Sequence, residues 1–316
     1  MKHLEVRKMR RGSIIFCLVV FLIFLSGCAV LTKTQIKEVD TFAATAKNYS
    51  TLPGTVIEKH GEMRKTQKML KASTFKEGET SLELIESALS SMEKLKKRAA
   101  EINGILNILD HYGDLLITLT SDKFTNEMQK NAETLGSEID KGINNHNKHY
   151  KTNFSLFGST VAAIVRGAAG ISIKRKQSKA LKRAVIEADP AVREMIAKVE
   201  KFLLLYLNEE GRKPETKGLI GNVESDLKET YKTIVEKYRD QGLPVPFGTV
   251  LIVADQLAAV KDTIRLVKNT LKAGRAYCAA HARLAESVKS KKSFKSAIKQ
   301  IRVLSEEIRA ARKLRK

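Results

Sequence analysis

Residues 80–120, TSLELIESALSSMEKLKKRAAEINGILNILDHYGDLLITLT, decide the fold class of this chain. Apolar and small side chains recur there at alternating steps of three and four: Ile85, Ala88, Met92, Leu95, Ala99, Ile102, Leu106, Leu109, Gly113 and Leu116. Such steps place side chains on one face of an α-helix, whereas a strand needs alternation at every second residue. The stretch therefore predicts a long helix with a heptad seam, which is typical of coiled-coil-like packing.

The same spacing returns after residue 250 and continues almost to the end of the chain. The positions are Val253, Leu257, Val260, Ile264, Val267, Leu271, Gly274, Cys278, His281, Ala285 and Val288, followed by Phe294, Ala297, Ile301, Leu304 and Ile308. No stretch alternates as a strand would, and only 5 prolines interrupt the 316 residues. We therefore expect an all-α fold, an elongated bundle of long amphipathic helices with coiled-coil-like heptad packing. The seams can pair within the chain or across a homo-oligomer.

Capping residues, glycines and prolines predict where the helices begin and end. Thr32 with Gln35 and Thr80 with Glu83 fit capping boxes at two helix starts. Further starts are expected at Ser121 and at Asp189-Pro190, and breaks are expected at Pro53-Gly54, at residues 211–214 and at residues 242–248.

The N-terminus combines a basic start, an apolar run at residues 14–25 (IIFCLVVFLIFL) and the sequence Leu25-Ser26-Gly27-Cys28. Twelve apolar residues are too few to cross a bilayer comfortably but suit a signal-peptide core. The order of these features resembles the signal peptide and lipobox of bacterial lipoproteins. The resemblance covers about 28 residues and implies cleavage between Gly27 and Cys28, acylation of Cys28 (palmitate among the chains) and export.

This resemblance gives an expected domain organisation and address. We expect a signal peptide at 1–27, a lipidated tether at 28–33, and a helical-bundle domain at 34–316 with a possible subdivision near 150–190. In Gram-negative members of the resembled class an Asp after the cysteine retains the protein at the inner membrane. Ala29 stands at that position, so we expect a lipid-anchored protein of the outer membrane facing the periplasm.

The charge of the chain points to anionic partners. The net charge is +22, and five basic side chains and one acidic side chain in the first 27 residues account for only +4 of it. A solvated lysine-rich surface is the alternative explanation. Export makes nucleic acid an unlikely partner, which leaves anionic lipid, lipopolysaccharide or a cell-wall polymer. The candidate contact residues are Lys174, Arg175, Lys176, Lys179, Lys182, Arg183, Lys289, Lys291, Lys292, Arg312 and Lys313.

Residues 154–173 (FSLFGSTVAAIVRGAAGISI) are apolar, rich in small residues, and contain the single charge Arg166. Their length and the basic residues that follow are typical of a membrane-contacting segment. The alternative is a tightly packed internal helix whose glycines allow close approach. A charge at the bilayer centre costs about 2.5–3.5 kcal/mol, so we favour internal packing.

We identify no catalytic residue, metal site or cofactor motif in the sequence. Cys278 and His281 share one helix face, as do His146 and His149, but neither pair has the third and fourth ligands that zinc needs. We therefore expect Cys278 and His281 to be core residues. Phosphate-binding loops, nucleophile elbows and the Glu-x-x-His pairs of di-metal bundles are also missing from the sequence.

Three classes of function remain open at this point. We expect first a non-enzymatic envelope lipoprotein that presents basic helical surfaces to an anionic component or partner protein. The second is a membrane-inserting or pore-forming protein that uses residues 154–173. The third is a ligand carrier or enzyme with a pocket inside the bundle.

Overall fold

The computed structural model describes residues 31–75, 78–121, 125–166, 173–207, 218–290 and 294–314, and these residues form helices and no strand. The helices are α2 (Lys33–Lys47), α3 (Leu52–Ala72), α4 (Gly78–Thr120), α5 (Asn126–Tyr150), α6 (Gly158–Val165), α7 (Ile173–Leu207), α8 (Gly218–Asp240), α9 (Phe247–Ser290) and α10 (Lys295–Lys313). The expected all-α bundle is confirmed.

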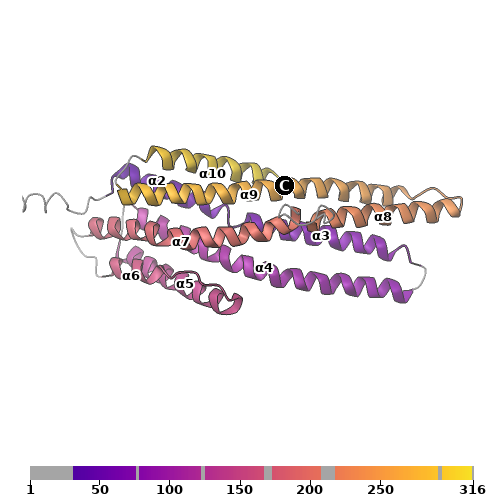
Figure 1. Cartoon of the computed structure of the whole chain (residues 1–316), viewed down its shortest axis with the longest axis horizontal. Coiled ribbons are helices and arrows are strands. Elements are labelled where there is room, and N and C mark those ends of the chain that lie inside the picture. Colours follow the sequence, from indigo (N-terminus) through magenta and orange to yellow (C-terminus); the bar gives the residue numbers. More distant parts are fainter. Residues whose placement is uncertain are drawn as a thin grey trace, which may run out of the picture.

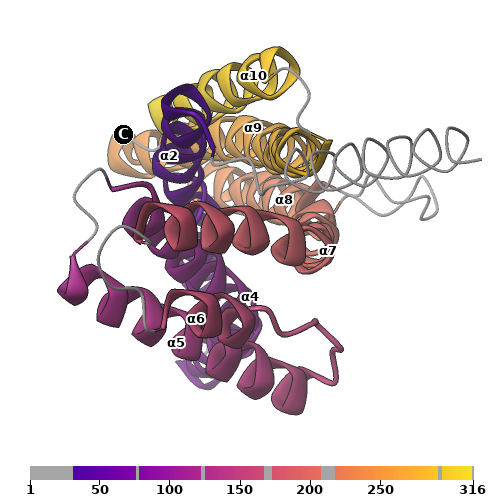
Figure 2. The ribbon, with the colours of Figure 1, turned by 90° about the vertical axis from the view of Figure 1, so that its left-hand side faces the viewer.

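The bundle is elongated along its two longest helices, α4 with 43 residues and α9 with 44 (Figure 1). At about 1.5 Å per residue each is roughly 65 Å long. Helix α9 packs against α7 and α10, and α4 packs against α2, α3, α5 and α7. The α8–α9 turn lies at one end of the molecule, while α2, α7 and α10 begin at the other end, which Figure 2 shows facing the viewer.

The large apolar side chains of the α4 seam are buried along its second half, while in the first half Ala88 is the buried seam residue. Ile102, Leu106, Leu109 and Leu116 are buried, whereas Ile85 and Leu95 are half-buried. The buried stripe is also wider than a two-position seam, because Ile105, Ile108, Tyr112, Leu115 and Leu119 are buried as well. Several helices surround this half of α4, so a broad face is covered. Coiled-coil packing of the seam stays a prediction.

Several predicted boundaries are confirmed. Thr32 caps α2 in a reciprocal capping box, in which the Gln35 backbone N–H donates to Thr32 Oγ1 (3.2 Å) and the Thr32 N–H donates to Gln35 Oε1 (2.8 Å). The break at 242–248 separates α8 from α9, and Gly242 takes the left-handed φ of 66° that ends α8. The break expected at 211–214 lies outside the described residues.

Three predicted boundaries are wrong by a few residues. Pro53 does not end the first helix; α2 ends at Lys47, and Pro53 lies in the first turn of α3, where its missing N–H needs no partner. Helix α4 begins at Gly78, so Thr80 lies inside it. The helix expected to start at Ser121 starts at Asn126, and its cap is Thr125, whose hydroxyl accepts from the Met128 N–H at 3.2 Å.

The predicted helix start at Asp189-Pro190 is also wrong, since α7 runs through both residues to Leu207. Pro190 is exposed, so its ring lies toward solvent rather than against a neighbouring helix. The buried positions around it, Ala188, Ala191 and Val192, are packed in the core. Core packing of the two halves of α7 therefore outweighs the local cost of a proline inside a helix.

The described part of segment 154–173 packs inside the bundle, against α5 and α7. Phe154, Phe157, Val161 and Val165 are all buried. The Asp140 carboxylate of α5 holds the start of α6, because it accepts from the backbone N–H groups of residues 157, 158 and 159 at 3.1, 2.7 and 2.7 Å. Among the described residues, no helix combines the length and apolarity needed to cross a bilayer.

Candidate functional site

The start of the described chain is fastened to the beginning of α7. The Leu31 backbone N–H donates to Ser178 Oγ at 2.7 Å, a contact between residues 147 apart in the sequence. Beside it, the Gln177 amide donates to the carbonyl oxygens of Leu119 and Ser121 at 2.9 and 2.7 Å, so the end of α4 is held at the same place. Gly27 and Cys28, the expected cleavage and acylation site, lie outside the described residues. Leu31 is three residues from Cys28.

Basic residues are frequent on the helix ends that meet at this end of the bundle, which we call the basic end. Figures 1 and 2 show the ribbon of this end. The basic residues come from the first three turns of α7, the first two turns of α2 and α10, and the last turn of α9. The members are Lys33, Lys37, Lys174, Arg175, Lys176, Lys179, Lys182, Arg183, Lys289, Lys295 and Lys299, and the acidic residues Glu38, Asp40, Glu187 and Glu286 lie near them on the same helices. Lys291 and Lys292 were predicted as part of the same surface and lie outside the described residues.

The cations of the basic end do not stabilise the helices that carry them. None of α2, α7 and α10 has an acidic residue in its first turn. Cations at a helix N-terminus face the positive end of the helix dipole, which costs about 0.3–1 kcal/mol for each. Within the basic end, Arg183 of α7 forms an ion pair with Glu187 of the same helix at 2.9 Å. The cluster therefore favours an anion from outside these helices.

Two of the predicted contact residues lie elsewhere. Arg312 and Lys313 are at the end of α10, about 25–28 Å from its start at 1.5 Å per residue. Arg312 donates to Asn48 Oδ1 at 3.0 Å, at the end of α2. Arg312 and Lys313 therefore lie apart from the basic end, and their contact with an anionic surface stays a prediction.

Arg312 and Lys313 line an open groove between α2 and α10, with a volume of about 990 Å³. Arg309 joins them on the α10 wall, and Asp40 and Asn48 lie on the α2 wall. The groove is shallow and lacks the enclosed walls of a ligand pocket.

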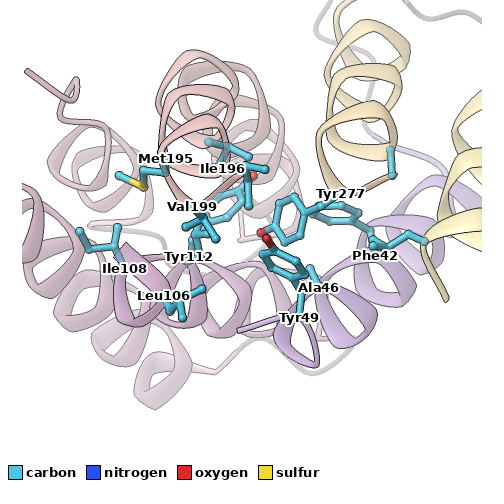
Figure 3. Close-up of a cluster of buried hydrophobic side chains, with 14 of the residues drawn as sticks. Phe42, Ala46, Tyr49, Leu106, Ile108, Tyr112, Met195, Ile196, Val199 and Tyr277 are labelled. Carbon is cyan, nitrogen blue, oxygen red and sulfur yellow. The ribbon is translucent and has the colours of Figure 1, made fainter. Parts of the chain in front are cut away.

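A hydrogen-bonded chain of polar side chains crosses three helices in the core. The Tyr112 hydroxyl of α4 lies 2.8 Å from His281 Nε2 of α9, and His281 Nδ1 lies 3.0 Å from Asp189 Oδ1 of α7. A carboxylate accepts only, so Nδ1–H donates to Asp189 and Nε2 accepts from the Tyr112 O–H. Asp189 also accepts from Arg193 at 2.8 Å. Figure 3 shows Tyr112 among the buried residues that surround this chain, including Phe42 and Tyr277.

Burial governs the protonation of this chain. It lowers the pKa of His281, and the hydrogen bond to Asp189 opposes this only in part. Burial acts to raise the pKa of Asp189, but hydrogen bonds from His281 and Arg193 outweigh it and lower that pKa. Burial raises the pKa of Tyr112 well above its ordinary value, and raises that of Cys278 to about 11.

These groups are poorly placed for chemistry on a substrate. The side chain of His281 is 0% exposed, and both of its nitrogens already have partners. A thiol with a raised pKa is a weak nucleophile. The prediction that His281 is a core residue is confirmed, and Cys278 is partly buried beside it.

The second histidine pair is divided between core and surface. His146 is buried, and its Nδ1 lies 3.0 Å from Thr152 Oγ1, while His149 is exposed. Both line a shallow depression of about 310 Å³ together with His111 and Glu138. Within the described ranges, no three His, Cys, Asp or Glu side chains are grouped as metal ligands.

Sequence reasoning missed two kinds of residue. Lys33 and Lys37 belong to the basic end but are spaced four apart rather than in a run, so only the capping box at Thr32 hinted at their position. The partners of His281 are 169 and 92 residues away in the sequence, and no local pattern could reveal them.

No protein-family model matches the chain, and comparisons with curated proteins and with solved structures find no match either.

Proposed function

We propose that this chain is a non-enzymatic envelope lipoprotein, held by acyl chains on Cys28, whose basic end contacts an anionic membrane surface. The observation that carries the proposal is the hydrogen bond between Leu31 N–H and Ser178 Oγ. It fastens the chain near the proposed acylation site to the most basic part of the bundle.

Distance supports a direct contact between the basic end and the headgroups. The three peptide steps from Cys28 to Leu31 span at most about 11 Å when fully extended. The screening length at physiological salt is about 8–10 Å. An acylated Cys28 lies in the membrane surface, so the basic side chains around Ser178 lie within reach of the surface potential.

The two attractions complement each other energetically. One acyl chain gives only marginal membrane binding. A second acyl chain or a basic patch makes the anchoring stable. Each Lys or Arg near an anionic surface contributes about 1 kcal/mol. The basic end therefore orients the bundle, with its long axis away from the anchoring membrane, while the acyl chains hold it there. Because Ala29 follows the cysteine, we place the protein at the outer membrane, facing the periplasm, in a Gram-negative cell.

The other two functions find less support. Insertion of residues 154–173 requires α6 to leave its buried place and the Asp140 carboxylate to lose three hydrogen bonds. The two hollows named above are open to solvent and do not have the enclosed walls of an internal ligand pocket.

The proposed acylation and membrane localisation are tested by measuring the intact mass and the membrane fractionation of the expressed chain and of its Cys28→Ala variant. We expect a cleaved, acylated, membrane-bound product that the variant does not form. An uncleaved or cytosolic product would contradict the proposal, and the charge of +22 would then need another anionic partner.

Binding by the basic end is tested with the mature chain, without acyl chains, on vesicles of phosphatidylglycerol, with lipopolysaccharide as a second arm. The triple charge reversal Lys174→Glu, Arg175→Glu and Lys179→Glu should abolish binding at low salt. The matched control reverses Arg309, Arg312 and Lys313, which carry the same charge at the far end of α10. Equal losses for both triplets would show that net charge alone drives binding.

A further inference from the structure

The tip of the α8–α9 hairpin, residues 241–254, is an exposed apolar surface. Its sequence, QGLPVPFGTVLIVA, contains no charged side chain. Of the eleven large apolar side chains exposed in the described residues, five lie between residues 243 and 252: Leu243, Phe247, Val250, Leu251 and Ile252. Phe247 is 78% exposed. Single exposed apolar residues are normal, but a contiguous group of this kind marks a site of interaction.

Backbone hydrogen bonds hold the tip in a defined conformation. Helix α8 closes with the Gly242 N–H donating to the Arg239 carbonyl and the Leu243 N–H donating to the Tyr238 carbonyl, both at 2.9 Å. This is a Schellman motif, which satisfies the last carbonyls of a helix. Helix α9 then begins with the Thr249 N–H donating to the Pro246 carbonyl at 2.9 Å. The apolar side chains are therefore held in position before any partner binds.

The direction of the exposed side chains indicates what covers them. At about 100° per residue, Val250, Phe247, Leu251 and Ile252 extend around roughly 200° of the first two turns of α9. Among these turns Val253 is the buried apolar residue. A protein partner that docks on one side would leave part of this circumference in water, whereas the acyl–headgroup boundary of a bilayer surrounds an inserted tip.

Depth and charge fit shallow insertion. Two helical turns rise about 11 Å, and interfacial apolar surfaces enter a bilayer by about 5–10 Å. The nearest charged residues in the sequence are Asp240 and Asp255, and Arg239 is paired to Asp240 at 3.7 Å. Together these bordering residues carry little net charge, so insertion of the tip does not depend on anionic lipid. This distinguishes the tip from the basic end.

The tip and the basic end lie at opposite ends of the molecule (Figure 1). Phe247 begins α9 and Lys289 lies in its last turn, so about 63 Å of helix separates them. We propose that the α8–α9 tip inserts shallowly into a second lipid bilayer, so that the protein bridges two membranes. The bridging part rests on the proposed function, which places the basic end at the first membrane.

The sequence provides a clean reporter for this insertion, since it contains no tryptophan. A Phe247→Trp variant of the full acylated chain is reconstituted into vesicles of phosphatidylcholine. Protein-free acceptor vesicles of brominated phosphatidylcholine are then added at high salt, which screens the basic end. We expect the tryptophan emission to shift to shorter wavelength and to be quenched by the acceptor lipid.

Vesicle clustering with the chain bearing its native Phe247 supplies a second measurement. Leu251→Ser should weaken clustering with acceptor vesicles by about tenfold, from the loss of one inserted leucine. Leu156→Ser is the matched control, because Leu156 is 47% exposed against 49% for Leu251 and lies in the α5–α6 connection. Equal effects of the two substitutions would overturn the assignment of the tip.

Three results of the quenching and clustering experiments would overturn the proposal. They are no quenching by acceptor lipid, quenching only when the brominated lipid is in the donor membrane, and clustering that requires protein on both vesicle populations. The last result would identify a second copy of this chain as the partner. Charge reversal of Lys174, Arg175 and Lys179 should leave quenching unchanged. The experiment therefore distinguishes loss of membrane binding by the basic end from loss of insertion by the tip. If Cys28 carries no acyl chain, the full chain added directly to brominated vesicles still decides whether the tip inserts.

Discussion

The hydroxyl of Tyr112 and Nε2 of His281 lie 2.8 Å apart in the core, although 169 residues separate them in the sequence. Through Asp189, 3.0 Å from the other ring nitrogen, the same histidine also joins α7. The side chain of His281 in α9 thereby links α4 and α7 through its two ring nitrogens. Buried polar groups with all partners in place specify a packing arrangement more strictly than apolar contacts do.

Removal of this histidine should destabilise the fold strongly. His281→Ala leaves the Tyr112 hydroxyl without its partner, takes a donor from Asp189 and opens a cavity, so we expect the free energy of unfolding to fall by about 3 kcal/mol or more. Urea denaturation of the mature chain measures it. His149→Ala, on the exposed face of α5, should stay within about 0.5 kcal/mol of the parent. Similar losses for both variants would contradict the role of the network.

Acidification should destabilise the protein before its carboxylates titrate. Burial and the Arg64 cation lower the pKa of His60 from 6.5 to about 4, and burial also lowers the pKa values of His146 and His281. The unfolded chain takes up these protons first. Stability is therefore fully present above pH 6.5 and is lost as pH falls toward the folded values.

For His60 this loss amounts to about 2 kcal/mol between pH 7 and pH 5. Urea midpoints at the two pH values measure it. His60→Phe should flatten the pH dependence, because the ring of His60 already packs edge-on against Tyr206 at 5.1 Å between centroids. A pH dependence that persists undiminished in His60→Phe would rule out His60 as a source.

The crossing of α5 and α6 should not tolerate a methyl group. A Cβ on Gly158 would overlap the carbonyl oxygen of Gly136, which is backbone and cannot rotate away. We expect Gly158→Ala to lower the free energy of unfolding by about 2–3 kcal/mol. Gly248 has open space around it, so Gly248→Ala should be neutral or stabilise α9 by up to about 1 kcal/mol. Thermal and urea unfolding of the two variants compare these sites, and a neutral Gly158→Ala would disprove the close approach.

The proline inside α7 should be replaceable with a gain in stability. Pro190 is exposed and contributes no N–H to the helix. A proline inside a helix lowers the stability of the fold by about 3 kcal/mol. Its rigidity reduces the conformational entropy of the unfolded chain, which offsets up to about 1 kcal/mol of that loss. Pro190→Ala should therefore raise the free energy of unfolding by about 2 kcal/mol. Pro244→Ala, in the loop before α9, should instead lower it slightly. Equal changes in the two variants would mean that α7 has adapted its backbone to the proline.

The sequence by itself determined the helical fold and several helix ends. Steps of three and four between apolar residues reflect the geometry of one helix, and the Thr32–Gln35 box and the Gly242 turn depend on residues within one or two turns. Local signals went wrong where distant contacts competed with them. Pro190 should have opened a helix, but the core around Ala188 and Val192 holds α7 together through it.

Only the tertiary structure decided which residues meet. It brought Leu31 to Ser178, separated Arg312 from Lys289, and left the apolar start of α9 without a covering helix. A helical pattern states which face of each helix is apolar, but it does not state which other helix covers that face. That choice depends on how all the faces pack at once, over sequence separations too long for any local pattern to encode.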